Sequence, residues 1–279
     1  MKIYTCIATD TGTKKKVNQD AVMLKVAETP SGETLTLAVL CDGLGGLSHG
    51  EAASAAFISA MEHWFTHTLA GILTGEDKTE ELSGSTGLTD YRKDVRLSWE
   101  KLIKEMNERI AAYGQSNGFQ LGTTAVCFLL IGTDFLLMNV GDSRLYKMTD
   151  TPEGIRQLTH DHSLVQRQID RGQISDDEAK TSKYKSVLLQ CIGASPEVVP
   201  DFFYGNVTRN SNYIVCTDGF WRKLSLDEME EVFSPQVCNS DEEAEERVHR
   251  MIETVKGRGE EDNISAILIG CSGFDTDSE

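Results

Sequence analysis

Five aspartates stand at positions where a carboxylate could serve a metal ion. Asp42, Asp142 and Asp218 each follow an apolar run of β type, and Asp20 and Asp262 each precede one. Because the ends of neighbouring strands meet at one edge of a sheet, we expect these carboxylates to converge. Carboxylates repel one another and are costly to cluster unless they are protonated or a cation lies between them. Of these two, bound metal is the more economical interpretation.

The ligand types indicate which metals such a site would take. Aspartate oxygens, a backbone carbonyl and water suit Mg²⁺, Mn²⁺ or Ca²⁺, whereas zinc favours the histidines and cysteines that these positions lack. The local sequences favour Mg²⁺ or Mn²⁺. A single Asp-Gly pair also ends many ordinary strands, so the prediction depends on the whole set of aspartates.

The elements that position these aspartates are strands followed or preceded by short turns. The runs beside Asp42, Asp142, Asp218 and Asp262 are LTLAVLC, TDFLLMNVG, SNYIVCT and ISAILIG. Each run suits a buried strand better than a helix.

Two segments between the second and third aspartates have helical spacing instead. Residues 48–69 carry small and apolar side chains at helical intervals, and residues 90–114 repeat the pattern. Gly114 is predicted to end the second helix. We expect the two helices to form one layer packed on a sheet.

Two further regions are polar. Residues 71–89 contain glycines and charges and are predicted to form an exposed, mobile excursion without chemistry. Residues 160–186 have amphipathic helical content but little continuous apolar surface.

Seven motifs occur in a fixed order along the chain. They are VNQD, CDGLGG, LGTTAV, NVGDSRLY, LTHDHSLV, CTDGF and EDNISAIL. The ordered set resembles the PP2C-type, metal-dependent protein serine/threonine phosphatases, especially the compact bacterial members, over residues 9–270. The resemblance implies an α+β fold, a four-layer αββα sandwich of two antiparallel sheets flanked by helices. We expect one domain over residues 1–279, ending in a short acidic tail.

The resemblance also implies roles for individual residues. The implied ligands of two Mg²⁺ or Mn²⁺ ions are Asp20, Asp42, the carbonyl of Gly43, Asp218 and Asp262, with Asp142 helping to bind a third, weaker ion. Asp42 would bridge the two ions, and Asp218 would hold the second. Both would be catalytic because they hold the ions that activate water. Residues 160–186 would form a flap beside the centre that influences substrate choice.

Two positions depart from the pattern of this family. Lys15 stands where an arginine commonly binds substrate phosphate, and lysine offers a point charge in place of a planar fork. A solvated lysine in the run Lys14 to Lys16 is the alternative. Leu44 stands where some members have a histidine that protonates the leaving group. Metal-bound water or His162 could supply that proton, although a lone histidine is more often structural.

Composition narrows the classes of partner and compartment. The formal net charge of −17 argues against nucleic acid and against an anionic membrane surface. No apolar stretch approaches the length of a membrane span, and the first ten residues do not resemble a signal peptide. We therefore expect a cytoplasmic monomer. The seven cysteines lack a C-x-x-C spacing and are predicted to be buried, reduced thiols.

The sequence thus predicts a bacterial-type enzyme that hydrolyses phosphoserine and phosphothreonine in phosphorylated proteins, opposing a serine/threonine kinase. The alternative is a phosphatase-like module that binds phosphoproteins in regulation with weak or no catalysis. Loss of metal carboxylates would be the signature of that alternative, and all five are present.

Overall fold

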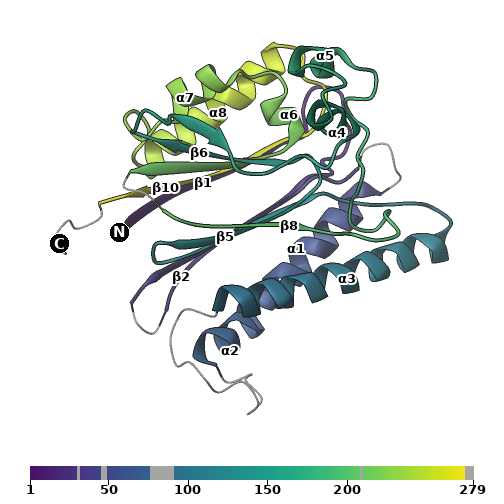
Figure 1. Cartoon of the computed structure of the whole chain (residues 1–279), viewed down its shortest axis with the longest axis horizontal. Helices are drawn as coiled ribbons and strands as arrows, with labels where there is room; N and C mark the ends of the chain where they lie inside the picture. Colours follow the sequence, from purple (N-terminus) through teal and green to yellow (C-terminus); the bar gives the residue numbers. More distant parts are fainter. Residues whose placement is uncertain (30–31, 45–48, 76–90, 208–209, 274–279) are drawn as a thin grey trace.

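Two five-stranded antiparallel sheets lie face to face, with helices on both outer faces (Figure 1). The computed structural model describes residues 1–279 except 30–31, 45–48, 76–90, 208–209 and 274–279. The acidic tail predicted at the end of the chain lies outside the described residues. Within the described part, the layers confirm the four-layer sandwich.

The first sheet contains both the first and the last strand of the chain. Its order is β1 (Lys2–Asp10), β10 (Ile264–Ser272), β9 (Ser211–Cys216), β6 (Arg144–Thr149) and β7 (Ile155–Gln157). The second sheet has the order β2 (Ala21–Glu28), β3 (Thr34–Cys41), β4 (Ala125–Ile131), β5 (Asp134–Val140) and β8 (Asp201–Asn206). The four apolar runs of the sequence are therefore β3, β5, β9 and β10.

Burial on both faces explains why these strands are continuous apolar runs. In β3, Leu37 and Val39 pack toward the helices, whereas Ala38 and Leu40 belong to the core between the sheets. Side chains alternate across a strand, so both sets must be apolar when each face is covered. The same alternation in β10 places Leu268 under the other helical layer and Ile267 between the sheets.

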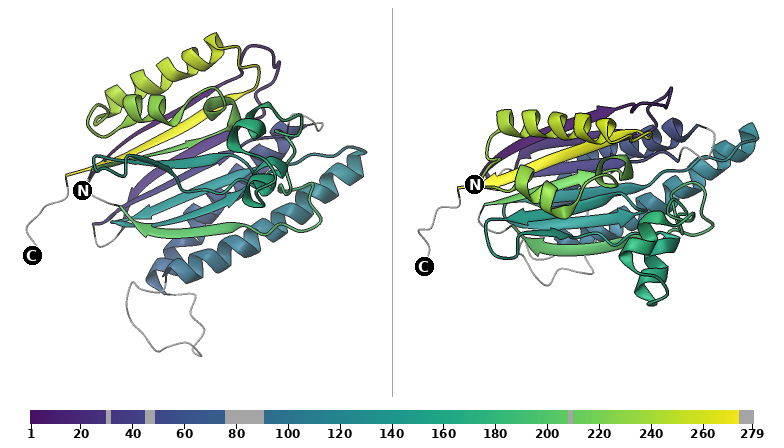
Figure 2. Two further views of the ribbon diagram at one scale, coloured as in Figure 1. Left: turned by 45° about the horizontal axis from the view of Figure 1, so that its top comes forward. Right: turned by 90° about the horizontal axis from the view of Figure 1, so that it is seen from above.

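The helices divide between the two outer faces, as the views in Figure 2 show. The second sheet is covered by α1 (Gly50–His67) and α3 (Tyr91–Asn117), with α2 (Leu69–Thr74) beside them. The first sheet is covered by α6 (Asp218–Trp221), α7 (Leu226–Phe233) and α8 (Asp241–Gly257). Two short helices, α4 (Leu164–Asp170) and α5 (Asp176–Thr181), lie at the end opposite to the chain termini.

The predicted end of α3 at Gly114 is wrong. The helix continues to Asn117 and ends in a Schellman motif, in which Phe119 N–H donates to the Gly114 carbonyl and Gly118 adopts φ +75°. Gly114 has another use: a Cβ there would lie 2.7 Å from the Leu121 side chain. Its missing side chain lets the chain after the helix fold back onto it.

Three other expectations can be compared with the structure. All seven cysteines are free and buried, as predicted. The excursion expected at residues 71–89 begins with helical residues of α2, and residues 76–90 lie outside the described part. Among the residues that the structure describes, no helix is long and apolar enough to cross a membrane.

Candidate metal centre

All five aspartates lie at one end of the two sheets. On the second sheet, the start of β2 pairs with the end of β3, since Ala21 lies opposite Cys41. On the first sheet, the start of β10 meets the end of β9, since Ala266 lies opposite Cys216. The chain crosses between the sheets here, from β1 to β2 and again from β5 to β6. These two crossings carry Asp20 and Asp142.

The carboxylate of Asp20 is held by two hydroxyl groups of the first sheet. Ser265 donates to Asp20 Oδ2 at 2.7 Å, and Thr217 donates to the same oxygen at 3.2 Å. Thr217 also accepts from Ser265 N–H at 3.0 Å. Asp20 directly precedes β2 of the second sheet, so its hydrogen bonds to the first sheet join the two sheets.

Two threonines of the LGTTAV motif fix the backbone of Asp42. Asp42 N–H donates to the Thr124 hydroxyl at 3.0 Å, and the Asp42 carbonyl accepts from Thr124 N–H at 2.9 Å. The Thr123 hydroxyl donates to the same carbonyl at 3.0 Å. With its backbone occupied in this way, Asp42 has only its carboxylate left to offer to the site.

Gly43 is a position where only glycine fits. A Cβ at Gly43 would lie 2.4 Å from the Gly50 carbonyl oxygen and 2.5 Å from the Gln19 carbonyl oxygen. Gly43 N–H donates to that same Gln19 oxygen at 3.1 Å. The glycine thus allows three backbone segments to meet beside Asp42.

The turn before β10 is organised by Asn263. Its side chain accepts from Gln19 N–H at 2.9 Å and donates to the Thr11 and Val17 carbonyls at 2.8 and 3.2 Å. Its backbone N–H donates to Asp262 Oδ1 at 3.0 Å. Asn263 therefore supports Asp262 through its backbone, while its side chain holds the loop that carries Lys15.

Burial and mutual repulsion act on the carboxyl groups together. Burial raises the pKa of Asp20 to about 7. The Ser265 hydrogen bond lowers this pKa, whereas the negative charge of Asp218 raises it further. Burial raises the pKa of Asp42 well above its usual value, and the charges of Asp20 and Asp218 add to this effect. Burial likewise raises the pKa of Asp218, which Arg222 opposes.

Asp142 is buried beside the same group. Burial raises its pKa to about 8, and the charge of Asp218 adds to this effect, while Arg222 and Arg144 lower it. Its backbone carbonyl accepts from Trp221 Nε1 at 3.2 Å. The Arg144 guanidinium lies over the indole ring of Trp221, 3.4 Å from the ring centroid. Burial and the proximity of like charges thus both disfavour ionised carboxyl groups at this end of the molecule.

The donor set fits a hard divalent cation. One oxygen, Asp218 Oδ1, is buried without a hydrogen-bond partner. As the described side chains are arranged, however, no three His, Cys, Asp or Glu residues enclose a single point for an ion. Two internal cations balance part of the charge instead: Lys15 Nζ lies 2.9 Å from Asp262 Oδ1, and Arg222 forms an ion pair with Asp218.

His162 lies in a hydrogen-bonded network that includes Gly141, the residue before Asp142. Its Nδ1 accepts from Gln190 Nε2 at 2.7 Å and from Gly141 N–H at 3.3 Å. Nε2 must then carry the proton, and it donates to Asp201 Oδ2 at 3.1 Å. With both nitrogens engaged and the ring buried, the geometry favours the structural interpretation of His162 over proton transfer.

Several supporting residues were not singled out from the sequence. They are Thr217, Ser265, Trp221 and Arg222. Thr217 precedes Asp218 directly, and a hydroxyl at that position is a recognisable signal for a helix start. Arg222 lies four residues after Asp218, which brings the two together only if the segment is helical.

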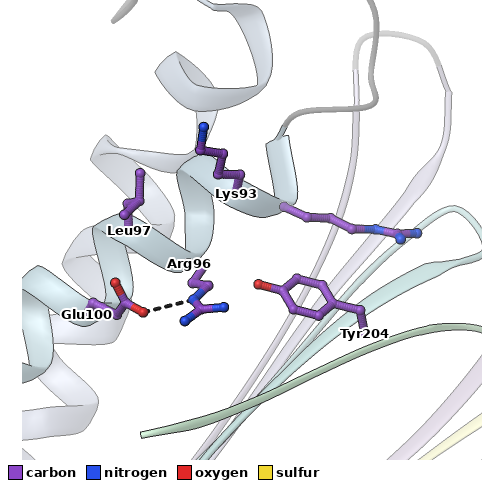
Figure 3. A pocket seen from close by; sticks show the side chains of 6 residues that line it. Lys93, Arg96, Leu97, Glu100 and Tyr204 are labelled. Carbon is purple, nitrogen blue, oxygen red and sulfur yellow. Dashed lines mark hydrogen bonds and ion pairs between the residues drawn. The ribbon is translucent and has the colours of Figure 1, made fainter. Parts of the chain in front are cut away.

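A pocket between α3 and β8 lies away from the centre (Figure 3). It is lined by Arg92, Lys93, Arg96, Leu97, Glu100 and Tyr204. Arg92 pairs with Asp134 at the start of β5, whereas Asp142 follows the opposite end of that strand. Leu97 of α3 is 53% exposed here. The arginines are already paired with carboxylates, so we assign no chemistry to this pocket.

Comparisons with known proteins agree on one family. The family model described as protein phosphatase 2C matches residues 10–256. The serine/threonine phosphatase stp of Listeria monocytogenes is 29% identical over 84% of this chain and 83% of its own length. The crystal structure of the serine/threonine phosphatase Stp1 from Staphylococcus aureus superposes with a TM-score of 0.76 at 24% identity, covering 98% of this chain and 96% of that one.

A further solved structure is the catalytic domain of the serine/threonine protein phosphatase PstP in complex with two manganese ions. It has a TM-score of 0.69 and 24% identity, and the match covers 97% of this chain and 99% of that one. At these identities, the two structures establish the fold, and the family model establishes the family.

Proposed function

Because this chain belongs to the protein phosphatase 2C family, we propose that it hydrolyses phosphoserine and phosphothreonine esters in proteins. The observation that carries the proposal is the gathering of five aspartates at one end of both sheets, where burial and neighbouring negative charges raise the pKa values of Asp20, Asp42 and Asp142. The named relatives are serine/threonine phosphatases, which supports the same reaction.

The residues proposed to hold two Mg²⁺ or Mn²⁺ ions are Asp20, Asp42, the carbonyl of Gly43, Asp218 and Asp262. Manganese in a solved relative supports this choice of metal. When bound, such ions lower the pKa of a water molecule and neutralise charge on the phosphoryl group. In the overall reaction a water oxygen forms a new bond to phosphorus and the ester P–O bond breaks, giving inorganic phosphate and a free side-chain hydroxyl.

The chain's own groups prepare this reaction by fixing the ligands. Thr217 and Ser265 orient the carboxylate of Asp20. Thr123 and Thr124 fix the backbone of Asp42, so its carboxylate does not have to be ordered when substrate arrives. Preorganised ligands of this kind lower the cost of assembling a reactive geometry.

Lys15 is proposed to bind the substrate phosphate. Its ammonium group forms an ion pair with Asp262. The negative charges of Asp42 and Asp218 also act on it, so the side chain already faces the centre. Burial acts to lower the pKa of Lys15, but the hydrogen bond to Asp262 and the charges of Asp262, Asp42 and Asp218 together outweigh burial and raise the pKa, so the side chain stays charged. Lys15→Arg should lower the Michaelis constant by offering two parallel donors to phosphate. An unchanged constant would favour a solvated lysine.

We further propose that His162 positions the flap instead of protonating the leaving group. Its two side-chain partners, Gln190 and Asp201, both belong to the chain that follows the flap. The Leu189 N–H also donates to the His162 carbonyl at 2.8 Å. A water molecule would then be left to protonate the leaving alkoxide.

We propose a single-domain, monomeric protein in the cytoplasm, acting on substrates of a serine/threonine kinase. Pairing of β1 with β10 from Lys2 to Asp10 supports one domain, because both ends of the chain share a sheet. The net charge of −17 disfavours nucleic acid as a partner.

The testing experiment is hydrolysis of a phosphothreonine peptide in EDTA, Mg²⁺ or Mn²⁺. Wild type should release phosphate only with metal, and Asp218→Ala should release little in any condition. Asp227→Ala, which removes an exposed aspartate of α7, is the matched control and should behave as wild type. A folded wild type that binds the peptide without releasing phosphate under any metal would favour the regulatory binding module.

A further inference from the structure

Arg222 occupies the space between Asp142 and Asp218. It directly follows α6, and its backbone N–H donates to the Asp218 carbonyl at 2.9 Å. One helical turn separates the two residues, so the Arg222 side chain returns to the start of the helix. There its guanidinium forms an ion pair with Asp218 Oδ2 and lies 3.9 Å from Asp142 Oδ2.

The guanidinium is largely enclosed and permanently charged. Its side chain is 18% exposed. Burial acts to lower the pKa of Arg222, but the carboxylates of Asp218, Asp142, Asp42 and Glu260 outweigh burial and raise it. Arginine does not lose its proton in proteins. A fixed positive charge therefore lies next to Asp142 Oδ2, an oxygen that a metal ion would otherwise bind.

The carboxyl group of Asp142 is already influenced by arginine side chains. Arg144 also acts on its carboxyl group, and Arg144 is itself fixed by three hydrogen bonds to Asp161. Trp221, between Asp218 and Arg222 in sequence, holds the Asp142 backbone carbonyl. A guanidinium thus stands beside Asp142, the residue for which the sequence resemblance implied a third ion.

Arg222 also reaches the flap. Its Nη2 donates to the hydroxyl of Ser186 at 3.3 Å. Ser186 ends the segment of residues 160–186, and the isolated pairing of Ser163 with Leu188 closes the base of that segment. One side chain thus contacts two aspartates of the centre and the end of the flap.

We infer that Arg222 takes the place of a third divalent cation between Asp142 and Asp218, and that it ties the flap to the centre through Ser186. This inference rests on the proposed function, because it concerns the ions of the same site. The chain then binds two metal ions, and its third positive charge is built into the polypeptide. Asp142 is a positioning residue for Arg222 in place of a metal ligand.

Counting bound Mn²⁺ tests the inference without measuring activity. Free Mn²⁺ is followed by electron paramagnetic resonance during titration of wild type, Arg222→Ala and Arg222→Met. We expect two ions per chain in wild type and three in each variant, because the Asp142 carboxylate becomes available. Adding Asp142→Asn to either variant should return the count to two. Arg222→Met keeps most of the side-chain volume and serves if the alanine variant does not fold.

Arg96→Ala is the matched control, since it removes a surface arginine paired with Glu100 on α3. It should bind two ions. A third ion in wild type, or no additional ion in folded Arg222→Met, would overturn the inference while leaving the proposed function intact. Wild type that binds no Mn²⁺ and releases no phosphate would overturn both.

Discussion

Replacement of Gly43 by alanine should disturb the centre more than its small size suggests. The new Cβ would lie 2.4 Å from the Gly50 carbonyl oxygen and 2.5 Å from that of Gln19. Both atoms belong to backbone, so neither can turn away as a flexible side chain does. Ordinary contact begins at 3.4 Å, so one backbone must move by 3.4 − 2.4 = 1.0 Å.

Two effects follow from this displacement. Overpacking of a closely packed site costs about 1–3 kcal/mol of unfolding free energy. At about 2–4 °C per kcal/mol for a large domain, the melting temperature should fall by about 2–12 °C. A shift of about 1 Å in a positioned catalytic group costs about 100-fold in rate. Hydrolysis should therefore fall by about that factor in protein that is still folded.

The assay compares Gly43→Ala with Gly257→Ala, measuring thermal unfolding, Mn²⁺ affinity and release of phosphate from a phosphothreonine peptide. Gly257 ends α8, and a Cβ there meets nothing within 4 Å. That control should be neutral or stabilised by about 1 kcal/mol, because alanine favours helix over glycine. Wild-type Mn²⁺ affinity and rate in Gly43→Ala would refute the reasoning about close backbone approach at the centre.

Three other changes give distinct outcomes. Asp42→Asn should remove most hydrolysis yet melt in EDTA at or above the wild-type temperature, because one of several repelling carboxylates is gone; a lower melting temperature in EDTA would contradict this. His162→Ala should lower thermal stability by about 1–3 kcal/mol through unpaired partners, with the basic limb of the pH–rate profile unchanged; loss of that limb would identify a general acid. Glu228→Gln should destabilise α7 at pH 7, where Arg258 and the Ser225 cap hold the pKa of Glu228 near 2. A carboxyl group whose pKa is lowered by folding stabilises the folded state at pH values above its ordinary pKa of 4.5, and this contribution is lost as the pH falls toward 2. The difference in melting temperature between wild type and Glu228→Gln should therefore vanish over that range.

The strands and their aspartates could be predicted from sequence because burial on both faces leaves a plain signal. A run such as that of β3 stays apolar along its length, and it ends where Asp42 and Gly43 begin a turn. The end of α3 was harder to place. Gly114 and Gly118 are both glycines near the helix end, and only the later one adopts positive φ.

Contacts between distant residues account for what sequence reasoning could not supply. The partners of His162 lie 28 and 39 residues further along the chain, at Gln190 and Asp201. The contact of Arg222 with Asp142 depends on the register of a single helical turn and on the crossing between sheets. Neither contact leaves a periodic pattern in the sequence. Motif and spacing therefore point to the aspartates but not to Arg222, which lies between two of them.

The placement of the four carboxylates that we propose as metal ligands would give the ions a role in holding the two sheets together. Asp218 and Asp262 adjoin the first sheet, whereas Asp20 and Asp42 adjoin the second. If these four residues hold the ions, as we propose, the ions would link the two sheets at this end and would resist sliding of one sheet over the other. Because ligands that bind only the folded state add to its stability, removal of such ions would weaken the protein's resistance to unfolding and proteolysis along with its chemistry.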